Sequence, residues 1–509
     1  MARKDPLDGA RTALDAARRG DVTACDALIE SLDGSLARFD DGTRGRAVSV
    51  LAASARHAAL GLDLARVAAL EERIAEARPA PAEGAPDVAA ELIAAWRALL
   101  SGAHALALEL ATAAASRASE RREPDLVVEA SSLAALARLA AGDVEQGLRV
   151  ARRASRMART EGIPLSEALA HLVLARARRA SGHAHLALLI TRSLGALPLA
   201  SHRGWLMLEH ALAGGARGDE PTPSEGLHAI AGALHGWRDA AEAGALPRFD
   251  DATGALRASL VGAPPMVREE IDALVLACDP RLDPGGTPLE SFLLGAGSEL
   301  PPSLRGMATT CGGAPETDAA VLYAVQLGEG PPRRLARLGR ALVGDDVPAL
   351  RQSRRHQGRA ETVIATLLLA GPGGLDEREC FRAVYGFEFV PEVHRGALDV
   401  ALHRAREQLG PLAALERQGG SIRLTAQGSL ICPDPRAGRS LSDKILAVLA
   451  EQGAQSAKTL ADAVGAPLRA AQAALTAMVE DGACEARRSG RGLEYHLEDT
   501  TFSEPTYLR

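Results

Sequence analysis

The stretch VPEVHRGALDVALHRAREQLG, residues 390–410, decides the fold of the C-terminal half of the chain. Pro391 suits the first position of a helix, where a missing N–H costs no hydrogen bond, and Gly410 suits the left-handed residue that ends a helix. The apolar stripe consists of Leu398, Leu402, Ala405 and Leu409, and the polar stripe beside it of Arg395, Asp399, His403 and Arg406. This pattern predicts an amphipathic helix. An ordinary surface helix has the same pattern, so the neighbouring segments must indicate what the polar stripe contacts.

The segments around this helix predict a small α/β unit over residues 319–431. The expected elements are two β-like runs around a Gly/Pro turn at 319–343, helices at 360–371 and 375–386, and a hairpin at 415–424. Sheet, three helices and hairpin in this order resemble the winged-helix output domain of OmpR/PhoB-type response regulators. The resemblance rests on VYG (384–386) and on LDVALHRAREQLG (398–410), which is similar to the recognition helix of that family.

The resemblance implies that the helix at 390–410 reaches into the major groove of DNA, with Arg404 and Arg406 contacting bases or phosphates. The candidate DNA-binding residues of this unit are Arg395, His403, Arg404, Arg406 and Arg417. Glu407 and Gln408 stand where the family has lysines, which reduces the positive charge that can meet phosphates. Binding of a protein through the same helix therefore stays open.

A second small unit is predicted over residues 440–498. The expected boundaries are a helix capped by Ser442 or Asp443, a short helix closed by Gly465, a third helix from Pro467 to Gly482, and a hairpin with Gly490 and Gly492 at its tip. This order resembles the MarR/IclR-like winged-helix class. The resemblance implies DNA contacts from the third helix and the hairpin, through Arg469, Gln472, Arg487, Arg488 and Arg491. A unit used only for dimerisation is the alternative, and residues 499–509 are expected to form a loose tail.

The N-terminal half repeats itself. Similar segments begin at Gly20, Gly61, Gly102, Gly142 and Gly182, which lie 40 or 41 residues apart. This period predicts a solenoid of helix pairs over residues 1–260, with each glycine in a positive-φ turn between two helices. The pattern resembles MalT-like and other tetratricopeptide-like repeats, which implies a groove that binds a protein, a peptide or a small effector. A helical extension and linker are expected at 261–318, and Trp96 and Trp205 are expected to be packing residues.

Composition favours a mainly α fold, because aromatic residues make up only 3% of the 509 residues. The formal net charge is −7, and residues 319–509 carry 24 Lys and Arg against 23 Asp and Glu. Positive charge is therefore only local, as in RRLARLGR (333–340) and RQSRRHQGR (351–359). Six scattered cysteines indicate reduced, buried thiols rather than a metal site.

Enzyme motifs are not found in the sequence. Lys4, Lys444 and Lys458 are the only lysines and none stands in a P-loop context, and neither GxSxG nor HExxH occurs. We therefore expect no catalytic residue, no cofactor and no metal. No basic leader and no long apolar run is present, so the sequence predicts a cytoplasmic protein without a membrane segment.

Two classes of function are compatible with these features. The first is a bacterial transcriptional regulator, in which a helical-repeat domain for sensing or docking is joined to tandem winged helices that bind double-stranded DNA. The second is a non-enzymatic adaptor whose repeats and winged helices all contact proteins. Oligomerisation stays open in both cases, and DNA binding that is lost with salt would separate the two.

Overall fold

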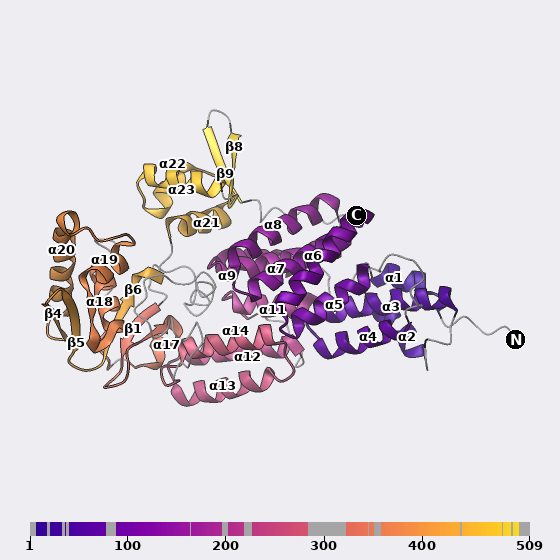
Figure 1. Ribbon diagram of the computed structural model, residues 1–509, viewed down its shortest axis with the longest axis horizontal. Coiled ribbons are helices and arrows are strands. Elements are labelled where there is room, and N and C mark those ends of the chain that lie inside the picture. The colour runs from indigo at the N-terminus through magenta and orange to yellow at the C-terminus, as the bar shows by residue number, and fades with distance from the viewer. Residues whose placement is uncertain are drawn as a thin grey trace.

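The computed structural model describes residues 7–17, 21–32, 36, 40–77, 88–162, 164–195, 202–217, 226–282, 322–344, 346–350, 358–437, 440–480, 482–489 and 492–497. Within these residues the chain is mainly helical, and small antiparallel sheets occur only toward the C-terminus. The expectation of a mainly α protein is thus confirmed. The molecule is elongated, with helices along most of its length and two smaller units at one end and on one flank (Figure 1).

Helices α1 to α14 form the larger part, which we call the helix array. Their bounds are α1 (Ala10–Ala17), α2 (Thr23–Ser31), α3 (Asp41–Leu60), α4 (Leu64–Ala77), α5 (Val88–Leu100), α6 (His104–Arg121), α7 (Pro124–Ala140), α8 (Val144–Glu161), α9 (Pro164–Ala180), α10 (Ala184–Gly195), α11 (Arg203–Leu212), α12 (Gly226–Glu242), α13 (Leu246–Ser259) and α14 (Pro265–Cys278). Buried side chains from nearly all of these helices belong to one continuous core. Helix α14, which the sequence assigned to an extension, belongs to that core.

The turns between paired helices repeat the same geometry. Gly102, Gly142 and Gly182 have φ values of 86°, 84° and 86°, as the sequence predicted. In each turn the following N–H donates to a carbonyl five residues earlier, for example Asp143 N to Arg138 O at 2.9 Å. The prediction is wrong at Gly61, whose φ is −81°, because the turn is displaced by one residue and Leu62 takes the positive φ of 55°. Gly20 lies outside the described residues.

Substitution of Gly142 by Ala measures how much the left-handed backbone conformation of these turns affects stability. An added β-carbon would meet no atom within 4 Å, so its effect comes from the left-handed conformation alone. We expect Gly142→Ala to lower the free energy of unfolding by about 1 kcal/mol. Gly254→Ala is the matched control, because Gly254 is an exposed residue inside α13 and alanine there should stabilise by about 0.5–1 kcal/mol. Chemical denaturation of both variants measures the change in the free energy of unfolding, which should be negative for Gly142→Ala and positive for Gly254→Ala. Changes of the same sign would contradict the role of the turn.

A buried ionic network joins α9, α11 and α14. Glu209 is 1% exposed and accepts from Arg176 Nη1 at 2.7 Å, from Arg179 Nη2 at 2.9 Å and from the indole N–H of Trp205 at 3.2 Å. Glu270 of α14 pairs with the same two arginines. Burial alone would raise the pKa of the Glu270 carboxyl, but Arg179 and Arg176 outweigh it and lower the pKa to about 2. The Glu270 carboxylate thus stays ionised inside the array.

The first C-terminal unit, the 322–434 unit, contains two three-stranded sheets around a helical core. Its elements are β1 (Leu322–Gln326), β2 (Arg333–Ala336), α17 (Arg337–Leu342), α18 (Arg359–Ala370), β3 (Leu375–Asp376), α19 (Glu377–Tyr385), α20 (Pro391–Leu409), β4 (Ala413–Gln418), β5 (Ser421–Ala426) and β6 (Leu430–Asp434). Strand β1 pairs with β2 and β6, while β5 pairs with β4 and β3. The second β-like run of the sequence ends early, because its Leu, Ala and Arg residues form α17 instead.

The second C-terminal unit, the 441–497 unit, has three helices and one small sheet. Its elements are α21 (Leu441–Gln452), β7 (Gln455–Ser456), α22 (Ala457–Val464), α23 (Leu468–Glu480), β8 (Glu485–Ser489) and β9 (Gly492–His496). Strand β9 lies between β7 and β8. The expected cap of the first helix is wrong. Ser440 is the N-cap, and Asp443 is the third helical residue that completes its capping box.

The 322–434 unit packs on the end of the array. Nη2 of Arg333 donates to the carbonyl of Leu276 at 2.8 Å, and Nη1 donates to that of Leu282. Gly339 of α17 lies so close to α14 that an added β-carbon would overlap the carbonyl of Cys278. Arg333 and Arg334 are 6% and 1% exposed, so the expectation that RRLARLGR offers charge to a nucleic acid is wrong for these two residues. Residues 351–357 of the other arginine-rich segment lie outside the described residues.

The 441–497 unit packs on the flank of the array, against α8 and α10 (Figure 1). Leu186 of α10 belongs to the hydrophobic core of this unit. Nε2 of His183 lies 2.7 Å from Oδ1 of Asp443, and the guanidinium of Arg152 lies beside Gly482. The two C-terminal units therefore have separate contacts with the array.

The contact between His183 and Asp443 predicts an acid-sensitive junction. Burial alone would raise the pKa of Asp443, but hydrogen bonds from His183 and Ser440 lower it from 3.8 to about 2. Because the folded pKa is below the unfolded one, the carboxylate stabilises the contact fully above about pH 4 and loses this effect as pH falls toward 2. In His183→Ala the pKa of Asp443 should return toward 3.8, so the junction should be weaker above pH 4 and should lose less stability as pH falls toward 2.

Hydrogen exchange of the α10 and α21 amides between pH 5 and pH 2.5 measures this shift. Glu451→Gln is the control, since Glu451 is an exposed carboxylate on the same helix as Asp443. Identical acid profiles for the wild type and His183→Ala would contradict the assigned role of the hydrogen bond.

Candidate nucleic-acid interface

Helix α20 begins and ends as its sequence predicted. Pro391 is the first helical residue, and Gly410 follows the last with a φ of 51°. The expected apolar stripe, Leu398, Leu402, Ala405 and Leu409, is buried, and the expected polar stripe, Arg395, Asp399, His403 and Arg406, is exposed. The helix therefore presents its polar stripe to solvent at the outer end of the molecule (Figure 1).

The charges on α20 largely cancel. Glu392, Asp399 and Glu407 oppose Arg395, Arg404 and Arg406 along the helix. Nε2 of His403 lies 3.4 Å from Glu407. Arg406 uses its Nε to donate to the carbonyl of Leu415 at 3.1 Å, which ties the helix to β4. A phosphate approaching this helix would thus meet little net positive charge.

Arg417, the candidate in the β4–β5 hairpin, is held inside its own unit. Its Nε donates to Glu377 at 2.7 Å, and its Nη1 pairs with Asp399 of α20. These carboxylates raise the pKa of Arg417, mainly through the hydrogen bond to Glu377. The side chain joins α19, α20 and β4, and a DNA contact would require it to leave both partners.

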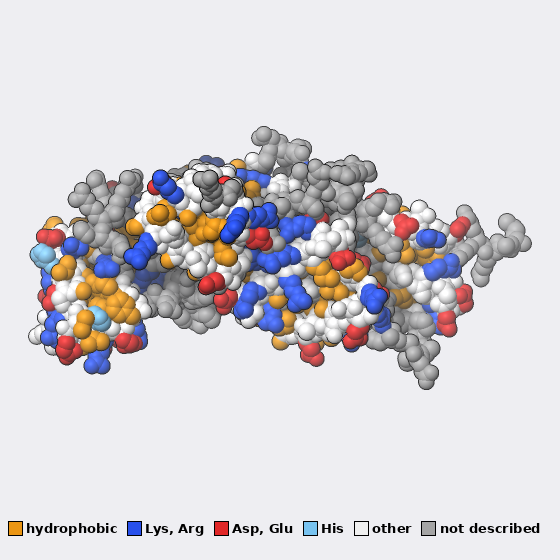
Figure 2. Space-filling view, turned by 90° about the horizontal axis from the view of Figure 1, so that it is seen from above, with side chains coloured by type: hydrophobic (Ala, Val, Ile, Leu, Met, Phe, Trp, Pro, Cys, Tyr) orange, Lys and Arg blue, Asp and Glu red, His pale blue; other side chains and the backbone are white. Residues whose placement is uncertain are grey.

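Apolar side chains are exposed beside the polar stripe of α20. Phe387, Val390, Val393 and Val400 are 50%, 44%, 71% and 50% exposed, and we call them the α20 apolar patch. In Figure 2, hydrophobic side chains cluster on the lobe at the left, which is the 322–434 unit. Such a patch is typical of a surface that meets another protein.

Helices α22 and α23 of the 441–497 unit present a different surface. Gly465, which the sequence placed at the end of the first of these helices, follows α22 with a φ of 64°. Arg469 and the neutral Gln472 are exposed on α23, and the one acidic residue of that helix is Glu480 at its end. Ala473 and Thr476 continue the exposed face with small side chains. This face can approach the edges of base pairs closely without carboxylate repulsion.

The β8–β9 hairpin places further arginines beside this helix. Arg487 and Arg488 are exposed on β8, and Arg487 has a weak ion pair with Glu485 at 3.4 Å. Arg491 lies outside the described residues. Four of the five candidates that the sequence proposed for this unit, Arg469, Gln472, Arg487 and Arg488, are thus exposed, and Arg487 and Arg488, as neighbours on one strand, point to opposite faces of the sheet.

A row of arginines on α8 was missed by the sequence analysis. Arg149, Arg153 and Arg156 are exposed at positions i, i+4 and i+7, and Arg152 of the same helix lies beside Gly482 of the 441–497 unit. Figure 2 looks down on the side of the molecule that carries α8 and this unit, and Lys and Arg side chains gather over the middle of it. The spacing of these arginines was readable from the sequence, but their position beside the second unit was not.

Comparison with known protein families, with curated proteins and with solved structures gives no match for this chain. Cys25, Cys278, Cys380, Cys432 and Cys484 are free and buried as expected, while Cys311 lies outside the described residues. In the part of the chain that the structure describes, no helix has both the length and the apolar character that crossing a membrane requires.

Proposed function

We propose that this chain is a bacterial transcriptional regulator that binds double-stranded DNA, in which the helix array is a solenoid and both C-terminal units are winged helices. The observation that carries the proposal is the set of polar and basic side chains on the surface of the 441–497 unit. Its helix–turn–helix presents Arg469 and Gln472 on a face without carboxylates, with Arg487 and Arg488 on the adjacent hairpin.

In this proposal α23 enters the major groove. Arg469 and Gln472 are residue types that read guanine and adenine through paired hydrogen bonds. Arg487 and Arg488 contact phosphates or the minor groove at the flank of the site. The exposed arginines of α8 extend the same basic surface, so the array contributes to the electrostatic part of binding.

Affinity of the full chain for duplex DNA, measured at several salt concentrations, tests the proposal. We expect Arg487→Ala with Arg488→Ala to weaken binding to every sequence and to lower the salt slope by about 0.9 for each phosphate that is no longer neutralised. Arg469→Ala with Gln472→Ala should instead reduce the preference for the target sequence, by about 1–3 kcal/mol for each base that these side chains read.

Arg395→Ala with Arg404→Ala is the matched control, because it removes the same charge from the 322–434 unit. It should change DNA affinity much less, since the charges of α20 largely cancel. Absence of binding at low salt, or a loss confined to the α20 variant, would reject the assignment of DNA contact to the 441–497 unit.

The α20 apolar patch favours a second function for the 322–434 unit, contact with a protein. A chain that binds DNA through one unit and a protein through the other would combine the two classes of function. If neither arginine pair affects DNA binding, the adaptor function is the better description of the whole chain.

A further inference from the structure

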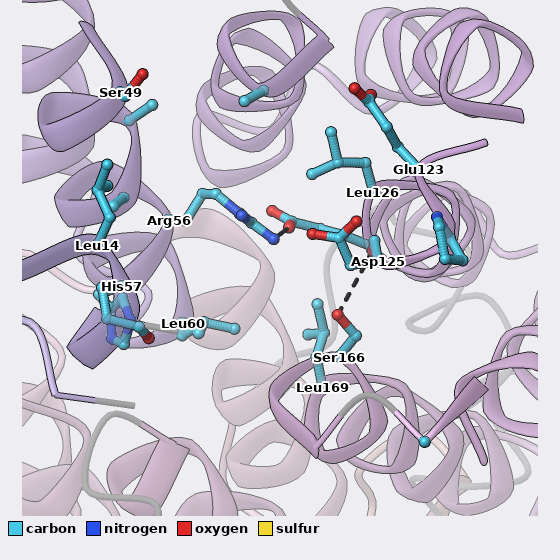
Figure 3. A pocket seen from close by; sticks show the side chains of 17 residues that line it. Leu14, Ser49, Arg56, His57, Leu60, Glu123, Asp125, Leu126, Ser166 and Leu169 are labelled. Atoms are coloured by element: carbon cyan, nitrogen blue, oxygen red, sulfur yellow. Dashed lines mark hydrogen bonds and ion pairs between the residues drawn. The ribbon is translucent and has the colours of Figure 1, made fainter. Parts of the chain in front are cut away.

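A cavity of about 750 Å³, partly open to solvent, lies between helices of the array. One wall is α3, with Arg56, His57 and Leu60, and the opposite wall is formed by the first turns of α7 and α9 (Figure 3). Leu14, Leu60, Leu126 and Leu169 give it an apolar lining. Its volume is within the range of small-molecule sites, and it combines an apolar lining with a few polar groups, as such sites do.

The guanidinium of Arg56, which lines the cavity, already has a carboxylate partner. Arg56 extends from α3 toward α7 and is ion-paired with Glu129, which is 3% exposed (Figure 3). The second oxygen of Glu129 accepts the indole N–H of Trp96 at 3.0 Å. Arg56 and Glu129 therefore form a fixed, neutral pair in the wall.

The hydroxyls of Ser49 and Ser166 in the lining donate to backbone carbonyls, and apart from Arg56 the other polar side chains of the cavity are hydrogen-bond acceptors. Glu123 and Asp125 line it, and neither carboxylate lies within ion-pair distance of a residue that the structure describes, although Asp125 is close enough to Arg56 to contribute to the raised pKa of that guanidinium. Oε2 of Glu123 is buried without a hydrogen-bond partner. His57, which is 7% exposed, bonds through Nε2 to the carbonyl of Ala17 at 3.1 Å and so has its lone pair on Nδ1, which is also without a partner. Unmet buried acceptors are costly, and a ligand that donates hydrogen bonds would satisfy them.

The geometry points to a binding site for a small apolar molecule that carries one ammonium group. The ammonium donates to Asp125 and Glu123 beside the neutral Arg56–Glu129 pair, and the apolar part lies against Leu60, Leu126 and Leu169. The first turns of α7 and α9 partly offset the two carboxylates through their helix dipoles, which leaves room for a single positive charge. This site is separate from the proposed DNA contact and does not depend on it.

Calorimetric titration of the full chain with three matched probes tests the inference: hexylammonium, hexanol and hexanoate. We expect saturable binding of hexylammonium, weaker binding of hexanol, and the weakest binding of hexanoate. Asp125→Asn with Glu123→Gln should weaken hexylammonium binding at least about tenfold, while Glu120→Gln, an exposed carboxylate on α6 outside the cavity, should leave it unchanged.

A second variant removes space rather than charge. Ala53→Leu adds three carbon atoms to a residue that lines the cavity and should weaken binding of all three probes. The relative affinities of the three probes for the wild type test the inference even if a variant fails to fold. Tighter binding of hexanoate than of hexylammonium would make Arg56 the anchor and overturn the inference, as would hexylammonium binding that is equally tight in Ala53→Leu and in the wild type.

Discussion

Glu209→Ala should be the most damaging single substitution in the helix array. Among the residues that the structure describes, it would leave Arg176 and Arg179, which are 8% and 2% exposed, with Glu270 as their one carboxylate partner. Removing one partner of a buried ionic network costs about 3–5 kcal/mol, because the remaining charges stay out of water without compensation. We therefore expect the array to unfold at a much lower denaturant concentration.

Tryptophan fluorescence gives a specific readout of this loss. The chain has three tryptophans, and Trp96, Trp205 and Trp237 are all buried in the array. Glu242→Ala is the matched control, since Glu242 is an exposed carboxylate at the end of α12 and its removal should shift the transition little. Glu209→Gln, which keeps the shape but not the charge, should fall between the two. A Glu209→Ala transition that coincides with that of Glu242→Ala would mean that the network contributes no net stability.

Asp434→Ala should have an effect of similar size in the 322–434 unit. Asp434 ends β6 and is 1% exposed; it accepts from Arg334 Nε at 3.2 Å and from Arg436 Nη2 at 2.7 Å. Burial alone would raise the pKa of Asp434, but Arg436 and Arg334 together lower it. Burial lowers the pKa of Arg334 to about 10, and Asp434 opposes that shift. Alanine would leave a buried guanidinium without this carboxylate, at a cost of about 3–5 kcal/mol.

Hydrogen exchange of the β1 and β6 amides measures this effect locally, because Asp434 pairs with Leu322 across these two strands. Asp346→Ala provides the control, as Asp346 is an exposed carboxylate in the same unit. Faster exchange in both strands is expected only for Asp434→Ala. Unchanged protection would show that Arg334 is satisfied by other groups.

Local sequence signals predicted individual elements well. Pro391 and Gly410 marked both ends of α20, and its period separated the buried from the exposed residues. Gly465 marked the turn between α22 and α23, whereas Gly492, expected at the tip of the hairpin, begins β9, and Gly490 lies outside the described residues. The displaced turn at Gly61 and the cap at Ser440 were missed, because several neighbouring residues can satisfy the same local rule and packing decides between them.

Contacts between distant segments could not be predicted in the same way. Nothing in RRLARLGR distinguishes the buried Arg333 and Arg334 from exposed arginines, since their partners lie on α14 and β6. Arg417 likewise meets Glu377 and Asp399 only after α19, α20 and β4 have packed. The cavity between α3 and α7 depends on helices that are far apart in sequence.

The contact of His183 with Asp443 joins residues that are 260 positions apart in the chain. During synthesis the array emerges from the ribosome and can fold long before α21 exists, so Leu186 of α10 is exposed on the nascent protein until the last segment arrives. Closing so long a loop costs only slightly more entropy than closing a loop of half the length. Because α21 is synthesised after the array, the junction should form late and determine the final folding phase. Chains that end before residue 441 would keep an uncovered, aggregation-prone apolar site on α10.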